Sequence, residues 1–155
     1  VPLYLQLEAI KKQLVPILLS QLAGCIIGVV SVVVIAKLMG APQEIIYSLA
    51  PKSVTTPIAM EVADTLGGIP ALTAAAVVCV GLLGSIIGIK TLKLTRIKSP
   101  IAQGLSLGAA AHAVGTSTAM DISSKYGAYA SLGLTLNGIF TALLTPTILR
   151  LLGLL

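Results

Sequence analysis

The chain has 155 residues, of which 56% are hydrophobic and only 10% charged, with a formal net charge of +5. A soluble domain carries about 25% charged residues, and the mean hydropathy here is +1.03, so the composition excludes a disordered chain and an ordinary soluble enzyme. Two cysteines are too few for a disulfide-stabilised scaffold. The positive charge does not indicate nucleic-acid binding, because there is no basic stripe and only 3% of the residues are aromatic.

The distribution of the charged residues indicates an integral membrane protein. Four stretches contain no Lys, Arg, Asp or Glu: 13–36, 65–89, 99–120 and 126–149. Each is 22 to 25 residues long, and about 20 apolar residues in a helix cross the hydrocarbon core of a bilayer. We therefore expect an all-α membrane protein in which residues 1–155 form one transmembrane domain.

The first expected element is a spanning helix at 14–38, directly after Lys11 and Lys12. The same region imitates a lipoprotein signal peptide that ends at Cys25, but the apolar run continues for eleven residues beyond it, whereas a processed lipoprotein turns polar there. We therefore expect Cys25, like Cys79, to behave as a small hydrophobic residue. Gly24 and Gly28 have the spacing of a face for close helix packing, as do Gly84 and Gly88.

The next elements alternate between broken and continuous helices. Segment 42–66 contains four charged residues and is interrupted at 53–57 (SVTTP), so it predicts two short helices around an unwound centre. A spanning helix follows at 69–92, then a second broken helix in 99–120, and a last spanning helix at 128–151. Non-helical backbone at membrane depth is tolerated only when it is buried in protein or lines a wet cavity.

An internal repeat supports this alternation. When the sequence is shifted by 60 residues, LAGCIIG at 22–28 lies over LLGSIIG at 82–88, and TPIAMEV at 56–62 lies over TSTAMDI at 116–122. The first repeat is then about 14–66, the second about 74–126, and the final span about 128–151. Each repeat contains a spanning helix and a broken helix.

The basic residues suggest that the two repeats are inverted. Lys and Arg cluster at 11–12 and at 90–98, and the positive-inside rule places both clusters in the cytoplasm. The broken helix between them must then be a re-entrant hairpin, and the two copies have opposite orientations. Inverted repeats with paired broken helices are typical of secondary transporters. In the alternative, both broken helices cross the membrane fully and the copies are parallel.

Polar residues near the two breaks are the candidate substrate-binding residues. We expect Thr56 to cap a half-helix that begins at Pro57, with Thr116 in the same place in the second copy. The N-terminus of a half-helix attracts anions, and Lys52 and His112 precede the two breaks. The candidate set is Lys52, Ser53, Thr55, Thr56, His112, Gly115, Thr116 and Ser117. The competing interpretation is that these groups only satisfy the backbone of packed hairpins, with Lys52 at the interface and His112 in an interhelical hydrogen bond.

Two acids are candidates for coupling to cations or protons. Glu61 and Asp121 occupy equivalent positions in the repeat, about one helical turn past the expected caps. An acid in a first helical turn is also favoured by the helix dipole alone, and Asp121 has the spacing of a capping box with Thr118. One histidine and two remote cysteines give no metal-ligand spacing. We expect no metal, no cofactor and no enzymatic activity.

Several motifs closely resemble the LrgB/CidB family. They are PKSVTTPIAM at 51–60, GGIP at 67–70, AHAVGT at 111–116 and GAYASL at 127–132, and the resemblance covers essentially the whole chain. It implies a multi-pass protein of the bacterial cytoplasmic (inner) membrane, or a relative of a translocator of the plastid inner envelope. Family members have further N-terminal spanning helices, which we expect to be absent from this chain.

The resemblance implies two alternative functions. One is transport of small carboxylates such as pyruvate, glycolate and glycerate. The other is an antiholin-like regulator of murein hydrolase export and autolysis that acts with a small LrgA/CidA-type membrane partner. In either case we expect a homo-oligomer in contact with membrane lipid and no nucleic-acid partner.

Overall fold

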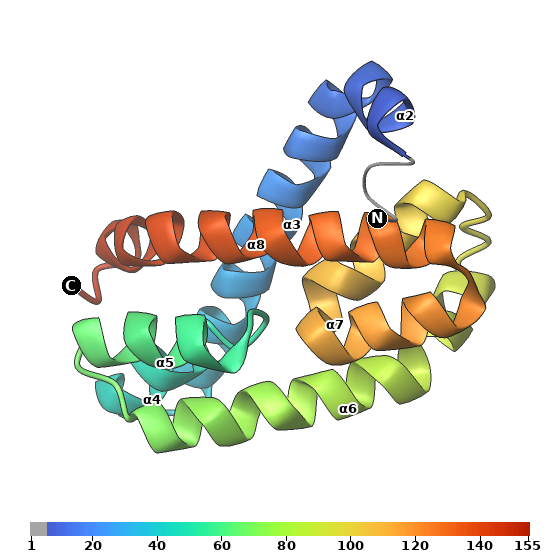
Figure 1. Cartoon of the computed structure of the whole chain (residues 1–155). Helices are drawn as coiled ribbons and strands as arrows, with labels where there is room; N and C mark the ends of the chain where they lie inside the picture. The colour runs from blue at the N-terminus through green and yellow to red at the C-terminus, as the bar shows by residue number, and fades with distance from the viewer. Residues whose placement is uncertain (1–5) are drawn as a thin grey trace.

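The computed structural model describes residues 6–155, which form helices joined by short loops and contain no strand. Seven helices follow one another in this part of the chain (Figure 1). They are α2 (Leu7–Lys12), α3 (Leu14–Leu38), α4 (Gln43–Leu49), α5 (Thr56–Thr65), α6 (Pro70–Leu94), α7 (Pro100–Ile122) and α8 (Ser124–Leu151).

Three of these helices, α3, α6 and α8, are long and apolar enough to cross a membrane. They confirm the three predicted spanning helices, and α3 has the predicted bounds. Helices of 25 residues are about 37 Å long, which exceeds the hydrocarbon thickness of about 30 Å. Their outward faces carry exposed large apolar side chains such as Ile27, Leu83 and Leu143, as expected for helices in lipid.

The three long helices alternate in direction. Near its start, α3 packs Ile17 against Tyr129 at the start of α8, and near its end it packs Val33 among residues that include Leu149 near the end of α8. Helices α3 and α8 therefore run in the same general direction, although they cross at a steep angle, and α6 runs opposite to α8 (Figure 1). The first end of the bundle is thus the one at which α3 and α8 begin and α6 ends. The second end is the opposite one.

The connection between α3 and α6 begins and finishes at the second end, so the chain must turn back within it. It enters as α4, continues without helix through residues 50–55 and returns as α5, and we call this unit the first hairpin. Ser48 joins it to α6: its Oγ accepts a hydrogen bond from the backbone N–H of Ile69 at 2.7 Å, and its carbonyl accepts one from Thr73 at 2.9 Å. A break between two short helices is therefore present, but it lies at 50–55 and not at 53–57, because Thr56 and Pro57 already belong to α5.

The connection between α6 and α8 turns back in the same way from the first end (Figure 1). Helix α7 is interrupted at Ala111 and His112, and His112 has φ +42°. Beyond the break the chain packs against its own first half, because a Cβ atom on Gly115 would overlap the carbonyl oxygen of Leu107. In one continuous helix these two residues would be about 12 Å apart. The two halves of α7 form the second hairpin.

Charge differs between the two ends. Seven of the ten basic residues belong to segments at the first end: Lys11, Lys12, Lys90, Lys93, Arg96, Lys98 and Lys125. Lys37 and Arg150 belong to the second end, together with Glu44 and Asp64. The two basic clusters seen in the sequence therefore lie at the same end of the bundle.

Candidate functional site

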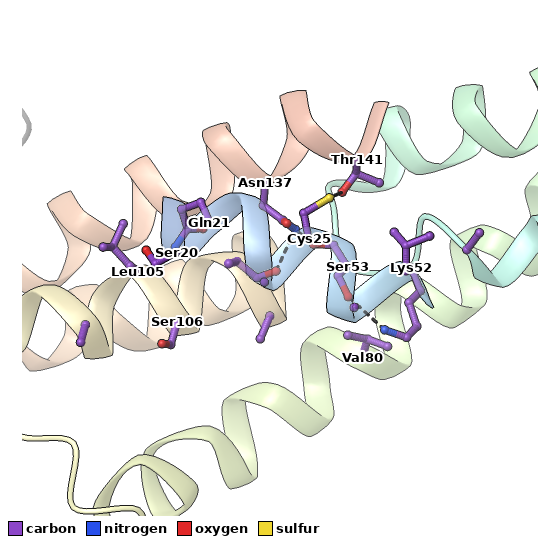
Figure 2. Close-up of a pocket in the computed structure, with 17 residues that line it drawn as sticks. Ser20, Gln21, Cys25, Lys52, Ser53, Val80, Leu105, Ser106, Asn137 and Thr141 are labelled. Carbon is purple, nitrogen blue, oxygen red and sulfur yellow. Dashed lines mark hydrogen bonds between the residues drawn. The ribbon is translucent and has the colours of Figure 1, made fainter. Parts of the chain in front are cut away.

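A cavity of about 460 Å³ lies where the tips of the two hairpins meet α3 and α8. Helix α3 contributes one wall, with residues from Ser20 to Val29. The first hairpin contributes Ala50, Lys52 and Ser53, the first half of α7 contributes small residues that include Ala109, and α8 contributes Asn137 and Thr141. Figure 2 shows Lys52 and Ser53 at one side of this cavity and Gln21 at the opposite side.

Lys52 is the one charged side chain among the residues that line the cavity. It is half-buried, and its Nζ lies 3.1 Å from Ser53 Oγ. None of the lining residues is Asp or Glu. Because an ammonium group removed from water is stabilised by a partner of opposite charge, the cavity favours an anion.

Asn137 of α8 joins the tips of the two hairpins. Its Nδ2 donates hydrogen bonds of 3.0 Å to the carbonyl oxygens of Ser53 and Ala109, and the side chain is only 4% exposed. Buried carbonyls next to a helix break need such donors, because the helical pattern no longer supplies them. The sequence analysis missed Asn137, although an amide within the charge-free stretch 126–149 was a signal for it.

Lys52 and Ser53 are the two members of the predicted substrate-binding set that line the cavity. Thr55 and Thr56 are half-buried at the start of α5, outside the lining. The expected cap at Thr56 is wrong: Thr56 is the first residue of α5, the capping position belongs to Thr55, and Thr55 makes no side-chain capping bond. Helix α5 therefore begins at Thr56, one residue before the start at Pro57 that the sequence suggested.

The second group of predicted residues packs the second hairpin. His112 is buried, and its Nε2 lies 2.9 Å from the carbonyl oxygen of Val77 in α6. Thr116 is also buried and donates to the carbonyl of His112 at 2.9 Å. Gly115 contacts the first half of α7, and Ser117 is exposed. None of these four residues lines the cavity. The contact of His112 with the carbonyl of Val77 is the interhelical hydrogen bond that was the competing interpretation for this residue.

The two candidate coupling acids are exposed and lie away from this cavity. Glu61 is in the middle of α5, where it borders a separate cavity of about 100 Å³. Asp121 is next to the last residue of α7. The proposed capping box with Thr118 is wrong, because the second half of α7 begins directly after His112 and Asp121 therefore lies in its last turn.

The two pairs of glycines have different surroundings. A Cβ atom on Gly88 would lie 2.8 Å from a side-chain carbon of Leu107, and one on Gly84 would overlap Ala111, so this pair packs closely against the second hairpin. Nothing lies within 4 Å of a Cβ atom on Gly24 or Gly28. These two glycines line the cavity instead of packing against a helix in the described part of the chain.

The comparisons with known proteins identify the family. Residues 1–151 match the model of the LrgB-like family. The chain is 41% identical to YwbG of Bacillus subtilis over 149 residues, which are 96% of this chain and 66% of YwbG. It is 36% identical to the holin-like protein CidB of Staphylococcus epidermidis, with 97% of this chain and 66% of the relative covered.

A third relative is the antiholin-like protein LrgB of Bacillus mycoides, at 35% identity over 99% of this chain and 66% of the relative. The chain thus spans about two thirds of the length of these relatives. No solved structure is significantly similar to it. From the match to the family model over residues 1–151, the chain belongs to the LrgB-like family.

Proposed function

We propose that the chain forms the substrate-binding core of a membrane transporter for small carboxylates of the pyruvate, glycolate and glycerate class. The observation that carries this proposal is the cavity between the hairpin tips, with Lys52 as its one charged lining residue and no acid among its lining residues. A carboxylate on Lys52 and the Ser53 hydroxyl would gain charge-assisted hydrogen bonds. The small side chains of Gly24, Ala109 and Ala110 leave room for its carbon skeleton.

The proposed architecture is an inverted repeat with two re-entrant hairpins. The hairpins begin at opposite ends of the bundle, and their non-helical segments, 50–55 and 111–112, correspond when the sequence is shifted by 60 residues. The excess of basic residues at the first end supports a cytoplasmic position for that end. We therefore propose a multi-pass protein of the bacterial inner membrane whose two hairpins enter from opposite sides.

Within this proposal, substrate lies between the two hairpin tips, at Lys52 and Ser53. The remaining six predicted binding residues shape the hairpins around it, while Glu61 and Asp121 stay candidates for coupling to protons or cations at a distance. We further propose that the chain is not an enzyme. Translocation requires only binding and release, and in this proposal the contact between Lys52 and Ser53 serves to hold the anion.

The alternative function is an antiholin-like regulator that acts with a small LrgA/CidA-type membrane partner. The names of the relatives support it, and so does one structural observation: the Gly24/Gly28 face of α3 has open space where a helix of a partner or of a second copy could pack. The two functions differ in which residues they require. Only transport needs the charge of Lys52, whereas Gly24 and Gly28 would serve either function, as cavity wall or as helix-packing face.

The test is uptake of labelled pyruvate, glycolate and glycerate into liposomes that contain the full chain, with and without the small partner. A charge-assisted hydrogen bond contributes about 1.5 to 3 kcal/mol, so Lys52→Met should reduce the uptake rate at low substrate by about 10- to 100-fold. Lys125→Met is the matched control, because Lys125 is exposed and outside the cavity. Thr116→Val should change uptake little, since its hydroxyl donates within its own hairpin.

Uptake that is equal in the Lys52→Met and Lys125→Met proteins would refute the role of the cavity. If none of these carboxylates enters the liposomes when the protein is well folded, with or without the small partner, the transporter proposal is wrong for these substrates. Gly24→Leu should then disrupt the interaction with the partner, which co-purification measures, and the regulator would be the better account.

A further inference from the structure

The turn from α6 into α7 carries a dense group of basic residues that the proposed function does not use. Four exposed side chains form this group, which we call the basic corner: Lys90, Lys93, Arg96 and Lys98. They are the basic residues of stretch 65–120, which contains no Asp or Glu. The positive-inside rule accounts for basic residues at this end of the bundle, but it does not account for how Arg96 is placed.

Arg96 occupies a backbone position at which the other helices of this chain use glycine. Its φ is +57°, a left-handed conformation that a residue with a Cβ atom rarely adopts. Its N–H donates to the carbonyl of Lys93 at 3.1 Å, and the next N–H donates to the carbonyl of Leu92 at 3.0 Å. The same pair of hydrogen bonds closes three other helices, each with a glycine at positive φ: Gly40 after α3, Gly67 after α5 and Gly153 after α8.

Glycine would close the turn after α6 without strain. An arginine at this position therefore costs stability, and it gives the corner a fourth positive charge beside the end of a helix. Strain of this kind is found where a side chain has a function that the fold alone does not require. The position of Arg96 thus indicates a ligand of opposite charge.

Hydrogen bonds hold the connection from α6 to α7 in one conformation. The side-chain Nε2 of Gln103 donates to the carbonyl of Ile97, and the backbone N–H of Gln103 donates to the carbonyl of Ser99 at 2.9 Å. Helix α7 begins at Pro100, so the partial positive charge of its N-terminus lies close to Lys98. A preformed turn of this kind loses little conformational entropy when it binds an anion.

The face of α6 that carries Lys90 and Lys93 is otherwise apolar. Ile86, Ile87 and Leu94 are 64%, 52% and 84% exposed, and residues three, four and seven positions apart lie on one side of a helix. In a spanning helix this face contacts acyl chains, while long basic side chains at its end reach the level of the phosphate groups. A free phosphate contacts only the cations, whereas a phospholipid contacts the cations and the apolar side chains together.

We propose that the basic corner binds an anionic phospholipid, with its phosphate on Arg96 and the neighbouring lysines and its acyl chains along Ile86, Ile87 and Leu94. A guanidinium group binds a phosphate through two parallel hydrogen bonds, and lysine adds a point charge. The proposal concerns a surface at the first end of the bundle and does not depend on which solute, if any, the cavity at Lys52 binds.

The test compares two lipids that have the same acyl chains and different charge. The purified full chain in a zwitterionic detergent is titrated with dioleoylphosphatidylglycerol, which is anionic, and with dioleoylphosphatidylcholine, which has no net charge. The lipid-dependent rise in the melting temperature gives the relative affinity. We expect the anionic lipid to bind at least about 10-fold more tightly at low salt, and the preference to shrink in 1 M NaCl, where the Debye length is about 3 Å.

Arg96→Gly separates a ligand-binding role from a structural one. It should weaken binding of phosphatidylglycerol by about 5-fold, the weight of one basic residue at an anionic surface, and leave phosphatidylcholine binding unchanged. Its lipid-free melting temperature should be no lower than that of the unmodified protein, because glycine adopts a positive φ without strain. Arg96→Lys keeps the charge and should keep the preference for the anionic lipid.

Arg150→Gln is the matched control. Arg150 is exposed and lies three residues before Gly153, as Lys93 lies three residues before Arg96, but it belongs to the second end of the bundle. Its replacement should leave the affinity for phosphatidylglycerol unchanged. Inorganic phosphate in the same assay should not raise the melting temperature.

Equal affinity of the unmodified protein for the two lipids would overturn the proposal. An affinity for phosphatidylglycerol that Arg96→Gly leaves unchanged, or that Arg150→Gln lowers equally, would also overturn it. If inorganic phosphate stabilises the protein as well as phosphatidylglycerol does, the corner binds free anions and the assignment to a lipid is wrong. Failure of the proposed transport function has a separate signature, because it appears in the uptake assay with Lys52→Met and leaves the lipid titrations unchanged.

Discussion

Replacing Asn137 by leucine removes a side chain of α8 that is hydrogen-bonded to both hairpin tips. The change deletes two hydrogen bonds of 3.0 Å, to the carbonyls of Ser53 and Ala109, at a position that is 4% exposed. Interhelical hydrogen bonds in membrane proteins contribute about 0.6 kcal/mol on average and about 1.7 kcal/mol at most. We therefore expect Asn137→Leu to lower the free energy of unfolding by about 1 to 3 kcal/mol, because two carbonyls lose their donor and leucine fills a similar volume.

Unfolding in mixed micelles with increasing SDS, followed by circular dichroism, measures this difference. Thr135→Val is the control, since the Thr135 hydroxyl is exposed and bonds only within α8, to the carbonyl of Ser131. It should change the free energy of unfolding by less than about 0.5 kcal/mol. Carboxylate uptake by Asn137→Leu should also fall, because Ser53 is no longer held at the cavity. An unfolding free energy within about 0.5 kcal/mol of the unmodified protein would show that Asn137 does not join the hairpins.

Two further predictions test the second hairpin and the topology. Gly115→Ala should prevent folding or strongly reduce the yield of folded protein in detergent, because its Cβ atom would overlap the carbonyl of Leu107. Gly24→Ala should be tolerated, because nothing lies within 4 Å of a Cβ atom there. Size-exclusion chromatography compares the two variants, and a well-folded Gly115→Ala protein would contradict the reversal of α7. Cysteines at Lys98 and Lys125, placed singly in a protein without Cys25 and Cys79, should react with a membrane-impermeant thiol reagent from the same side of the membrane, and a cysteine at Gln43 from the other side. Reaction of the first two from opposite sides would mean that α7 crosses the membrane fully.

Five positions show how far sequence reasoning reaches into the candidate site. Lys52 and Ser53 were found because a cation and a hydroxyl beside a break are unusual within apolar sequence, and local composition reveals that. Gln21 and Asn137 were missed because single amides in long apolar helices are ambiguous: they face lipid, a neighbouring helix or a cavity according to how the helices pack. His112 was expected near the substrate for its chemistry, yet the turn at Ala111 and His112 directs its ring to the carbonyl of Val77.

The sequence by itself determined the class of the protein and its succession of elements. Charge-free stretches of 22 to 25 residues predict spanning helices because a bilayer excludes unpaired charge along the whole length of a helix. The interruption at 53–57 predicts a break because proline and hydroxyl residues weaken the local helical hydrogen bonds. These are local effects, and periodicity and composition record them directly.

Only the tertiary structure decided where the functional groups meet. Asn137 contacts Ser53, which is 84 positions earlier, and Ala109, which is 28 positions earlier. The cavity exists because both hairpins end in the middle of the bundle, at a depth fixed by the lengths of their halves and by glycines that allow α6 and α7 to approach closely. Such contacts depend on how the helices cross and on the point at which α7 reverses. Many weak packing interactions together set both, and no local pattern in the sequence encodes them.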